Sequence, residues 1–396
     1  MFGLATPPLS LYVHFPWCVR KCPYCDFNSY TLHGELAEDH YVEALERDLE
    51  AQSADVAGRE VISIFLGGGT PSLFTAQAVG RVLGAARRHF TVAPDVEVTM
   101  EANPGAIERG RFQEYRAAGV TRISLGAQSF DPERLTALGR IHSPDETRHA
   151  AAELHAAGLD NFNLDLMYAL PGQGADGAAR DVQEALALAP AHVSHYQLTI
   201  EQGTVFAAQP PLLPADDVAA DMLAECGRRL ADAGFAQYEV SAYARPGRRC
   251  RHNLNYWTFG DYLGVGAGAH GKLTFPASGR IVRTVQPREP RRYLAAAPSG
   301  LTRKAVPRRE RPFEFMLNAL RLVEGFETAS FSERTGLDWE EVSKTVSSLV
   351  GKGLIVGQGT RYRATPRGLQ FLNDVLLSFV PESPKTPGGF RLSTVE

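Results

Sequence analysis

The feature that most constrains this 396-residue chain is a regular alternation of short apolar runs and longer helical stretches in its first half. Runs rich in β-branched and aromatic residues predict six strands, at Leu11–Phe15, Val61–Leu66, Val96–Met100, Thr121–Leu125, Asn161–Met167 and Val193–Thr199. The stretches between them predict helices at Glu38–Gln52, Thr75–His89, Arg109–Ala118, Asp145–Ala157 and Gly177–Ala189. Such alternation indicates an α/β fold with a parallel sheet, and six units favour a partial (β/α)6 TIM-like barrel over an open doubly wound sheet.

Polar or glycine-rich segments follow five of the six predicted strands. They are the cysteine loop, Gly67-Gly68-Gly69-Thr70-Pro71, Glu101-Ala102-Asn103-Pro104, Gly126-Ala127-Gln128-Ser129, and the segment from Asp165 to Leu170-Pro171-Gly172. In a parallel barrel the carboxyl ends of all strands meet at one edge, where the site is built. We therefore expect these segments to surround one site.

Three cysteines crowd the loop after the first strand. Cys18, Cys22 and Cys25 have the spacing C-x3-C-x2-C, whereas Cys226 and Cys250 are isolated and distant. Thiolates are soft ligands that select iron–sulfur clusters, zinc or copper(I). Three of them on a four-iron cubane leave one iron open to a small molecule, while zinc with four protein ligands is the alternative. Cysteines in this arrangement do not form a disulfide framework, which indicates a reducing, cytoplasmic compartment.

Composition shifts predict how the rest of the chain is organised. Prolines at 210, 211 and 214 mark a linker. Helices near Phe313–Val323 and Trp339–Val350, a hairpin formed by 353–356 and 361–364, and a last helix over Arg367–Phe379 suggest a winged-helix-like module. The predicted domains are a barrel core at 1–210, a barrel extension at 211–300, the C-terminal winged-helix-like domain at 301–380 and a disordered tail at 381–396.

Two classes of partner are disfavoured by composition. A net charge of −4 argues against bulk nucleic-acid binding. No run of about 18 apolar residues is present, so we expect no membrane-spanning helix. The first ten residues do not resemble a secretory signal.

The cysteine spacing, with an aromatic residue before the third cysteine, resembles the signature of the radical-SAM superfamily. The flanking segments 12–18 and 23–28 resemble the oxygen-independent coproporphyrinogen III oxidase branch and, within it, the HemW family of heme chaperones, over nearly the whole chain. This resemblance implies a [4Fe-4S] cluster on Cys18, Cys22 and Cys25, with S-adenosylmethionine (SAM) on the open iron. It implies SAM contacts from Tyr12, Tyr24, Gly68, Gly69, Thr70, Glu101, Gln128, Arg140 and Asp165.

Two features distinguish the chaperones from the oxidases of this branch. The oxidases carry a fourth cysteine two positions after the third, where this chain has Phe27. The segment 252–257 resembles the H-N-x-x-Y-W motif that HemW proteins use for heme, which implies heme contacts from His252, Asn253, Tyr256 and Trp257. A histidine can ligate heme iron, aromatic rings can cover a porphyrin, and the arginines at 248, 249 and 251 could pair with propionates. A packed structural His252 is the alternative.

The resemblance implies a heme chaperone that passes heme to apo-hemoproteins, including membrane respiratory enzymes, and allows a homodimer. It implies that coproporphyrinogen oxidase activity is lacking, even if SAM is cleaved. A radical-SAM oxidase and a DNA-binding redox sensor are the alternative functions.

The segment Gly266-Ala267-Gly268-Ala269-His270-Gly271 satisfies the dinucleotide pattern G-x-G-x-x-G. The residues after it do not begin a helix, so we expect no nicotinamide or flavin site there. The family resemblance places His270 near the SAM pocket instead.

Overall fold

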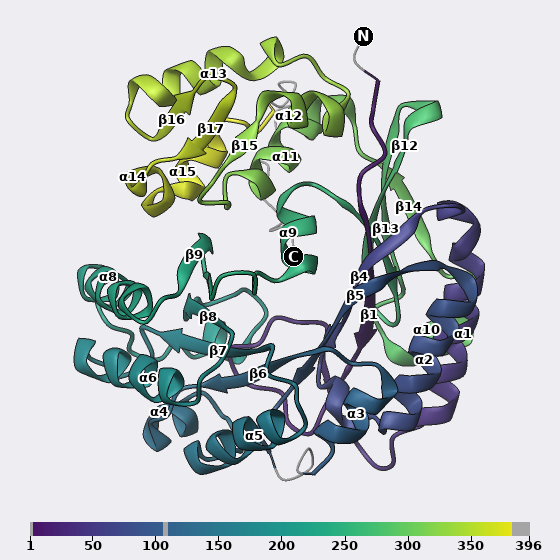
Figure 1. Cartoon of the computed structure of the whole chain (residues 1–396), viewed down its shortest axis with the longest axis vertical. Coiled ribbons are helices and arrows are strands. Elements are labelled where there is room, and N and C mark those ends of the chain that lie inside the picture. The colour runs from purple at the N-terminus through teal and green to yellow at the C-terminus, as the bar shows by residue number, and fades with distance from the viewer. Residues whose placement is uncertain (1–2, 106–109, 382–396) are drawn as a thin grey trace.

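The computed structural model describes residues 3–105 and 110–381. Within these residues, a mixed sheet of 12 strands forms the centre of the fold (Figure 1). Its centre consists of six parallel strands in chain order: β1 (Leu9–Phe15), β4 (Glu60–Gly68), β5 (Thr91–Ala102), β6 (Arg122–Gln128), β7 (Phe162–Tyr168) and β8 (His192–Gln197). The six predicted strands and the partial (β/α)6 barrel are confirmed.

Helices connect these strands along the outer side of the curved sheet (Figure 1). They are α1 (Glu38–Ser53), α2 (Ala76–His89), α3 (Phe112–Ala118), α5 (Pro144–Ala156) and α6 (Ala175–Ala187), near the predicted positions. Arg109, where one predicted helix begins, lies outside the described residues. The short α4 (Pro132–Ala137), which the sequence analysis missed, is capped by Asp131. Among the described residues, no helix combines the length and the apolar character needed to cross a bilayer.

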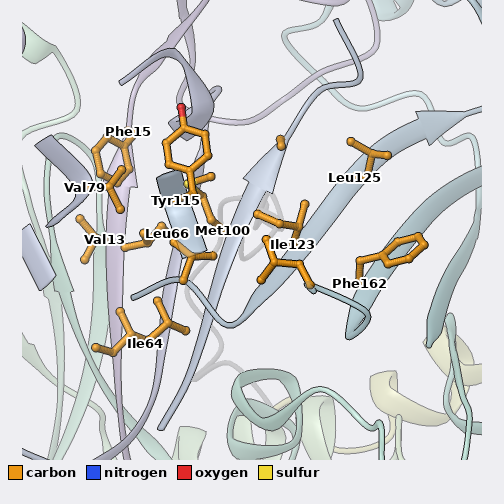
Figure 2. Packing of buried hydrophobic residues seen from close by; sticks show 14 of the residues in the cluster. Val13, Phe15, Ile64, Leu66, Val79, Met100, Tyr115, Ile123, Leu125 and Phe162 are labelled. Atoms are coloured by element: carbon orange, nitrogen blue, oxygen red, sulfur yellow. The ribbon is translucent and has the colours of Figure 1, made fainter. Parts of the chain in front are cut away.

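Along each strand, side chains point alternately outward into the core under the helices and inward into the barrel. Val13 and Phe15 on β1, Ile64 and Leu66 on β4, and Ile123 and Leu125 on β6 are fully buried; Figure 2 shows them packed with Val79, Met100, Tyr115 and Phe162. Successive side chains of a strand point to opposite faces. Neighbouring positions, such as Tyr12 and Phe65, therefore face the barrel interior, where the cavities lie.

The segment after β8 extends the sheet at both edges. After α7 (Val205–Ala208) and α8 (Asp216–Asp232), the hairpin β9 (Ala236–Glu239) and β10 (Ala242–Ala244) pairs with β8. After α9 (Arg251–Trp257), β11 (Asp261–Val265) lies parallel to β1, and β12 (His270–Phe275), β13 (Arg280–Val285) and β14 (Thr302–Ala305) continue antiparallel, with α10 (Pro290–Ala296) between the last two. The domain boundaries at 210 and 300 stay predictions.

The C-terminal module has winged-helix topology. Its elements are α11 (Arg311–Ala319), β15 (Phe326–Glu327), α12 (Thr328–Thr335), α13 (Glu340–Gly351), β16 (Ile355–Gln358) and β17 (Arg361–Ala364), and β17 pairs with both other strands. The single helix predicted over Arg367–Phe379 is wrong. Phe371, with φ −110° and ψ 36°, leaves helical geometry and separates α14 (Pro366–Gln370) from α15 (Leu372–Leu377). The predicted disordered tail lies outside the described residues except for Pro381.

Candidate cluster and SAM site

The cysteine loop is closed by a two-stranded ladder. β2 (Trp17–Cys18) pairs in parallel with β3 (Tyr30–Thr31), so the chain returns to its starting point after Cys22 and Cys25. The amide of Cys25 donates to the carbonyl of Cys22 at 3.2 Å, which forms a tight turn. Lys21 crosses the loop and its Nζ donates to the carbonyls of Phe27 (2.9 Å) and Ser29 (3.1 Å). The loop is therefore folded by its own backbone.

The three thiols are partly buried and lie near one another. Burial raises the pKa of Cys18, and the charges of Cys25 and Cys22 raise it further. Burial also raises the pKa of Cys25, although Lys21 acts in the opposite direction. Metal ligation requires thiolates, so a bound cation would favour the ionised form of Cys18 and Cys25 that burial opposes.

The thiols open onto a cavity of about 590 Å³ at the carboxyl ends of the barrel strands. Eight of the nine residues predicted to contact SAM line this cavity: Tyr24, Gly68, Gly69, Thr70, Glu101, Gln128, Arg140 and Asp165. The ninth, Tyr12, lies on a neighbouring cavity, where its hydroxyl is 2.7 Å from Nδ1 of His14. The structure thus brings these eight residues together beside the cysteines, and the contacts of all nine residues with SAM stay predictions.

The glycine loop after β4 is docked against the cysteine loop. The amide of Gly69 donates to the carbonyl of Phe15, and the amide of Thr70 to that of Trp17, each at 2.7 Å. A Cβ at Gly69 would lie 2.5 Å from the carbonyl oxygen of Trp17. Gly68 has a φ of +112°, a conformation that favours glycine, and its amide donates to Oε2 of Glu101 at 2.9 Å. These glycines are required by the fold as well as by any ligand.

The partly buried carboxyl groups of Glu101 and Asp165 line the cavity. Burial raises the pKa of Glu101 to about 8, and the charge of Asp165 acts in the same direction. Burial also raises the pKa of Asp165, which accepts hydrogen bonds from Ser124 Oγ (3.1 Å) and Asn163 Nδ2 (2.8 Å). Carboxyl oxygens in a buried site are suitable acceptors for the hydroxyl groups of a ribose.

Arg140 links the cysteine loop to the strand ends. Its Nη1 is 3.7 Å from Cys22 Sγ, and its Nη2 donates to the carbonyl of Gly126 and to Oδ1 of Asn103. Nδ2 of Asn103 in turn donates to Oγ1 of Thr70 at 3.0 Å. The sequence predicted that the segment with Asn103 would surround the site, but it assigned contacts only to Arg140 and Thr70 and none to Asn103.

A second residue that the sequence analysis missed is Tyr196, on β8. Its hydroxyl donates to Oε1 of Gln128 at 2.9 Å and so orients that amide. Gln128 has a φ of +65°. A left-handed conformation in a residue other than glycine is uncommon and often accompanies functional sites.

The residues of the H-N-x-x-Y-W motif lie on α9. His252 is buried and its ring stacks on Phe65 with centroids 4.2 Å apart. Its Nδ1 is 3.1 Å from Cys250 Sγ and 3.8 Å from Oε1 of Glu97. Burial lowers the pKa of His252, but Cys250 and Glu97 together raise it to about 9. Asn253 lines the cysteine cavity together with His252.

The arginines beside this motif are engaged elsewhere. Arg249 forms an ion pair with Glu324 at 2.5 Å, and Arg251 with Asp95 at 2.9 Å. Neither is among the residues that line the two cavities. The structure therefore does not bring them to a position where they would meet heme propionates from either cavity.

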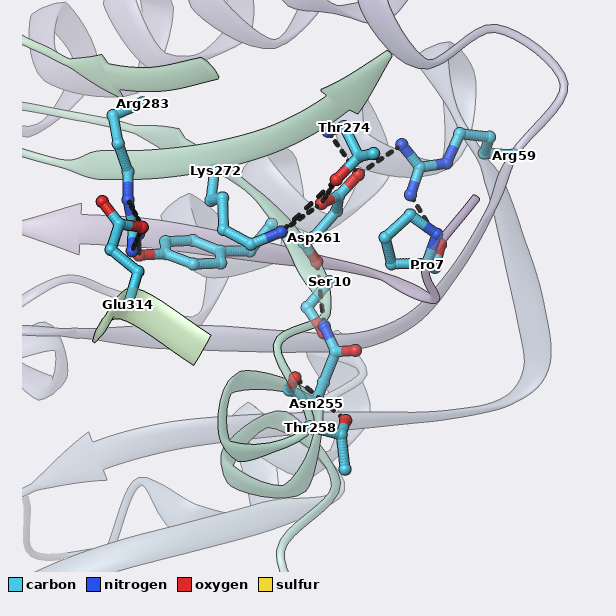
Figure 3. Close-up of polar contacts among 11 residues, drawn as sticks. Pro7, Ser10, Arg59, Asn255, Thr258, Asp261, Lys272, Thr274, Arg283 and Glu314 are labelled. Atoms are coloured by element: carbon cyan, nitrogen blue, oxygen red, sulfur yellow. Dashed lines mark hydrogen bonds and ion pairs between the residues drawn. The ribbon is translucent and has the colours of Figure 1, made fainter. Parts of the chain in front are cut away.

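A second cavity of about 490 Å³ lies beside the first and shares a wall with it. Tyr256 lines this second cavity, and Trp257 lines both. Behind it, Figure 3 shows a buried network in which Asp261 pairs with Lys272 (2.7 Å) and Arg59 (2.9 Å). Arg283 pairs with Glu314 of α11 at 2.7 Å, so the C-terminal module contributes to this wall.

The segment 266–271 runs directly into the strand β12, which begins at His270, and no helix starts there as the dinucleotide fingerprint requires. Nδ2 of Asn28, in the cysteine loop, donates to the carbonyl of Ala267 at 2.9 Å. A Cβ at Gly268 would lie 2.1 Å from the same nitrogen. The glycine at 268 therefore allows this segment to dock on the cysteine loop.

Comparisons with known proteins agree with this geometry. The family model of the radical SAM superfamily matches residues 12–185, and that of the HemN C-terminal domain matches residues 306–371. Heme chaperone HemW of Escherichia coli K12 is 47% identical over 381 residues, covering 95% of this chain and 99% of that protein. Heme chaperone HemW of Haemophilus influenzae is 44% identical over 380 residues, with coverages of 95% and 99%.

Among solved structures, the coproporphyrinogen III oxidase HemN from Escherichia coli, described as a radical SAM enzyme, matches with a TM-score of 0.79. The match covers 94% of this chain and 90% of HemN at 23% sequence identity, and it shows that the two share a fold. The two relatives, 47% and 44% identical over nearly their whole length, and the radical SAM family model establish that this chain belongs to the HemW family of radical SAM proteins.

Proposed function

We propose that this chain is a heme chaperone that carries a [4Fe-4S] cluster on Cys18, Cys22 and Cys25 and binds SAM beside it. The observation that carries the proposal is the similarity to heme chaperone HemW over 95% of the chain. The cysteine cavity supports it, because three thiols open onto a space lined by the glycine loop and two partly buried carboxyl groups. In our proposal heme passes to apo-hemoproteins in the cytoplasm or at membrane respiratory enzymes.

The residues present fit such a cluster. The donor set consists of three sulfurs, and no further cysteine lines the described cavity. When bound, the cluster would supply an open iron for the amino and carboxylate groups of SAM and an electron to it. Arg140 would offset negative charge at Cys22, and Gly68 would let the backbone approach the ligand. Glu101 and Asp165 would accept hydrogen bonds from the ribose hydroxyls.

Phe27 supports a chaperone rather than an oxidase. It occupies the position where oxidases of the branch carry a fourth cysteine, and its side chain is 58% exposed at the entrance to both cavities. A phenyl ring there can neither ligate metal nor transfer a proton. It offers apolar surface to a ligand entering or leaving.

Anaerobic reconstitution with iron and sulfide, followed by heme titration and assays for SAM cleavage and coproporphyrinogen turnover on one sample, tests the proposal. We expect one heme per chain and no decarboxylated porphyrinogen. Appearance of that product would assign the chain to the oxidases, and absence of heme binding would contradict the chaperone function. Duplex DNA binding that weakens with salt would instead favour the sensor.

A matched pair of variants tests the cluster ligands. Cys22→Ser should abolish the cluster absorbance, whereas Cys226→Ser should retain it, because Cys226 is buried in α8 far along the chain. Retention of the cluster without Cys22 would show that other residues hold it.

A further inference from the structure

A buried group of three potential metal ligands lies where α9 begins, apart from the cysteine loop. Within the described part of the chain, Glu97, Cys250 and His252 form a group whose donor atoms all lie within 4.8 Å of one another. Cys250 immediately precedes α9, His252 lies in its first turn, and Glu97 lies on β5. All three side chains are buried. Ionisable groups are seldom brought together away from water unless they satisfy one another or hold an ion.

The separations between the donor atoms fit one tetrahedral ion. Sγ of Cys250 lies 3.1 Å from Nδ1 of His252 and 3.8 Å from Oε1 of Glu97, and Nδ1 lies 3.8 Å from the same oxygen. Ligand atoms about 2.0–2.3 Å from a tetrahedral zinc ion lie about 3.3–3.6 Å from each other. Each observed separation is within about 0.5 Å of that range, so small side-chain movements would bring all three donors to one ion.

The types of donor favour zinc. A thiolate disfavours magnesium and calcium, which prefer oxygen ligands, and a carboxylate disfavours copper(I), which prefers thiolates and thioethers. Zinc accepts cysteine, histidine and acidic ligands together, and many of its sites hold three protein ligands and one water molecule. One thiol, one imidazole and one carboxyl group therefore match zinc better than the harder and the softer cations.

Neighbouring groups hold the donors in place. The amide of Arg251 donates to Oε1 of Glu97 at 2.8 Å, and the ring of Phe65 stacks on His252 with centroids 4.2 Å apart. The side chain of Cys250 makes no capping hydrogen bond to α9, and its Sγ lies nearer to Nδ1 of His252 than to Nε2, which is 3.5 Å away. Fixed partners of this kind orient metal ligands and increase the affinity for the metal.

One cation already lies close to this group. Burial lowers the pKa of Arg122, but the charges of Cys250 and Glu97 raise it, which indicates that the guanidinium group lies near both. A positive charge beside a thiol favours the thiolate that metal binding requires. Zinc bound to one thiolate, one carboxylate and one neutral imidazole carries no net charge, so the loaded site would not repel the guanidinium group.

An ion can reach the group from the cysteine cavity. His252 and Arg122 line this cavity, whereas Glu97 and Cys250 are not among its lining residues. The side of the group next to the cavity is therefore where an ion enters and where a water molecule can complete the coordination.

We infer that Glu97, Cys250 and His252 bind one zinc ion that fastens the start of α9 to β5. The ion takes the place of the protons that otherwise link the three groups, and binding releases these protons to solvent. The helix contacts β1, β4, β11 and α11 of the C-terminal module, and Figure 1 shows it between the barrel and that module. Tyr256 and Trp257 lie on this helix, so the ion would also fix rings that line the two cavities.

Zinc content and zinc X-ray absorption of the full-length protein, reconstituted with iron, sulfide and Zn²⁺ and then dialysed, test the inference. We expect one zinc per chain in addition to the cluster iron, bound by one sulfur at about 2.3 Å and by nitrogen and oxygen at about 2.0–2.1 Å. The zinc absorption edge is distinct from that of iron, so the cluster does not interfere. Absence of bound zinc, or a zinc ion with two or more sulfur ligands, would overturn the inference.

Matched variants separate this site from the cysteine loop. Cys250→Ser should weaken zinc binding at least about 100-fold, because loss of a residue that only supports a metal ligand already costs about 10- to 100-fold. Cys22→Ser should lose the cluster and keep the zinc. Cys226→Ser, which changes a similarly buried cysteine in α8, is the control and should keep both. Zinc that disappears without Cys22 and persists without Cys250 would belong to the cysteine loop, which contradicts the inference.

The unfolding midpoint distinguishes the loss of a ligand from the loss of the fold. Zinc should raise the midpoint of the wild-type protein and leave that of Cys250→Ser unchanged. If Cys250→Ser does not fold, Glu97→Gln takes its place, because it keeps the size of the side chain and an acceptor for the Arg251 amide. It should weaken zinc binding at least about tenfold, and wild-type zinc affinity would contradict the inference. Heme and SAM take no part in these measurements, so the inference and the proposed function can fail separately.

Discussion

Replacing Gly69 with alanine tests whether the glycine loop is shaped by its contact with the cysteine loop. The new Cβ would lie 2.5 Å from the carbonyl oxygen of Trp17 and 2.8 Å from that of Phe15, roughly 1 Å short of an ordinary contact of about 3.4 Å. Both neighbours are backbone atoms, so rotation of a side chain cannot relieve the clash. The loop must move away, which lengthens the two 2.7 Å hydrogen bonds that hold it.

The magnitude follows from these two contributions. Overpacking costs about 1–3 kcal/mol and each of the two weakened hydrogen bonds about 1 kcal/mol, so we expect a loss of about 3–5 kcal/mol at this contact. If the loop is docked only when SAM binds, the same free energy appears as a loss of affinity of about 140- to 3,700-fold. If it is docked already, the free energy of unfolding falls by that amount.

Equilibrium dialysis of SAM on reconstituted protein and urea unfolding of the same samples measure both quantities. Gly351→Ala is the control, because a Cβ at Gly351 in α13 meets nothing within 4 Å. It should leave SAM affinity unchanged and alter stability by less than about 1 kcal/mol. Wild-type affinity together with wild-type stability in Gly69→Ala would refute the steric reasoning.

Two further predictions concern buried charge. The pKa of Glu101 is about 8 in the folded protein and near 4.5 in the unfolded chain. Between these pH values the folded state binds the proton and the unfolded state does not. The contribution of Glu101 to the free energy of unfolding should therefore fall as the pH rises from 4.5 to 8, by at most about 1.4 kcal/mol per pH unit. Urea unfolding of the apoprotein should show a flatter pH dependence for Glu101→Gln, and identical slopes would remove Glu101 as the cause. Asp261→Asn should lower the free energy of unfolding by about 3–5 kcal/mol, because it leaves the Lys272 ammonium buried without its carboxylate. Adding Lys272→Met should recover part of that loss, and a single-variant loss below about 1 kcal/mol would show that the pair is not coupled.

The central strands could be predicted from the sequence because both of their faces are covered. Strands such as β4 and β7 are buried along most of their length, so apolar residues dominate them, with Ser63 in β4 and Asn163 and Asp165 in β7 among the exceptions. The short strands β9 and β10 at the edge of this sheet and the helix α9 are not marked by apolar runs of this kind. β9 and β10 have four and three residues, and α9 has seven, which is too short for a clear helical periodicity.

The candidate site could be predicted as far as the strand order allowed. Residues at consecutive strand ends, such as Thr70 after β4 and Glu101 at the end of β5, meet because parallel strands end at one edge. Tyr12 points into the barrel, as the alternation of side chains along β1 requires. This alternation does not tell which of the two cavities the side chain lines. The contact of His252 with Glu97 could not be foreseen either, because Glu97 lies on β5, 155 positions earlier in the sequence.

The pairing of β11 with β1 has a consequence for how the protein is made. Leu9 pairs with Asp261, so β1 leaves the ribosome well before its neighbour β11, which is synthesised about 250 residues later. At about 5–20 residues per second, that interval is about 13–50 s. Throughout it the nascent barrel exposes an unpaired strand edge, the kind of surface on which chains aggregate. A chain cut just before β11 should therefore precipitate during translation, even though Cys18, Cys22 and Cys25 are already present.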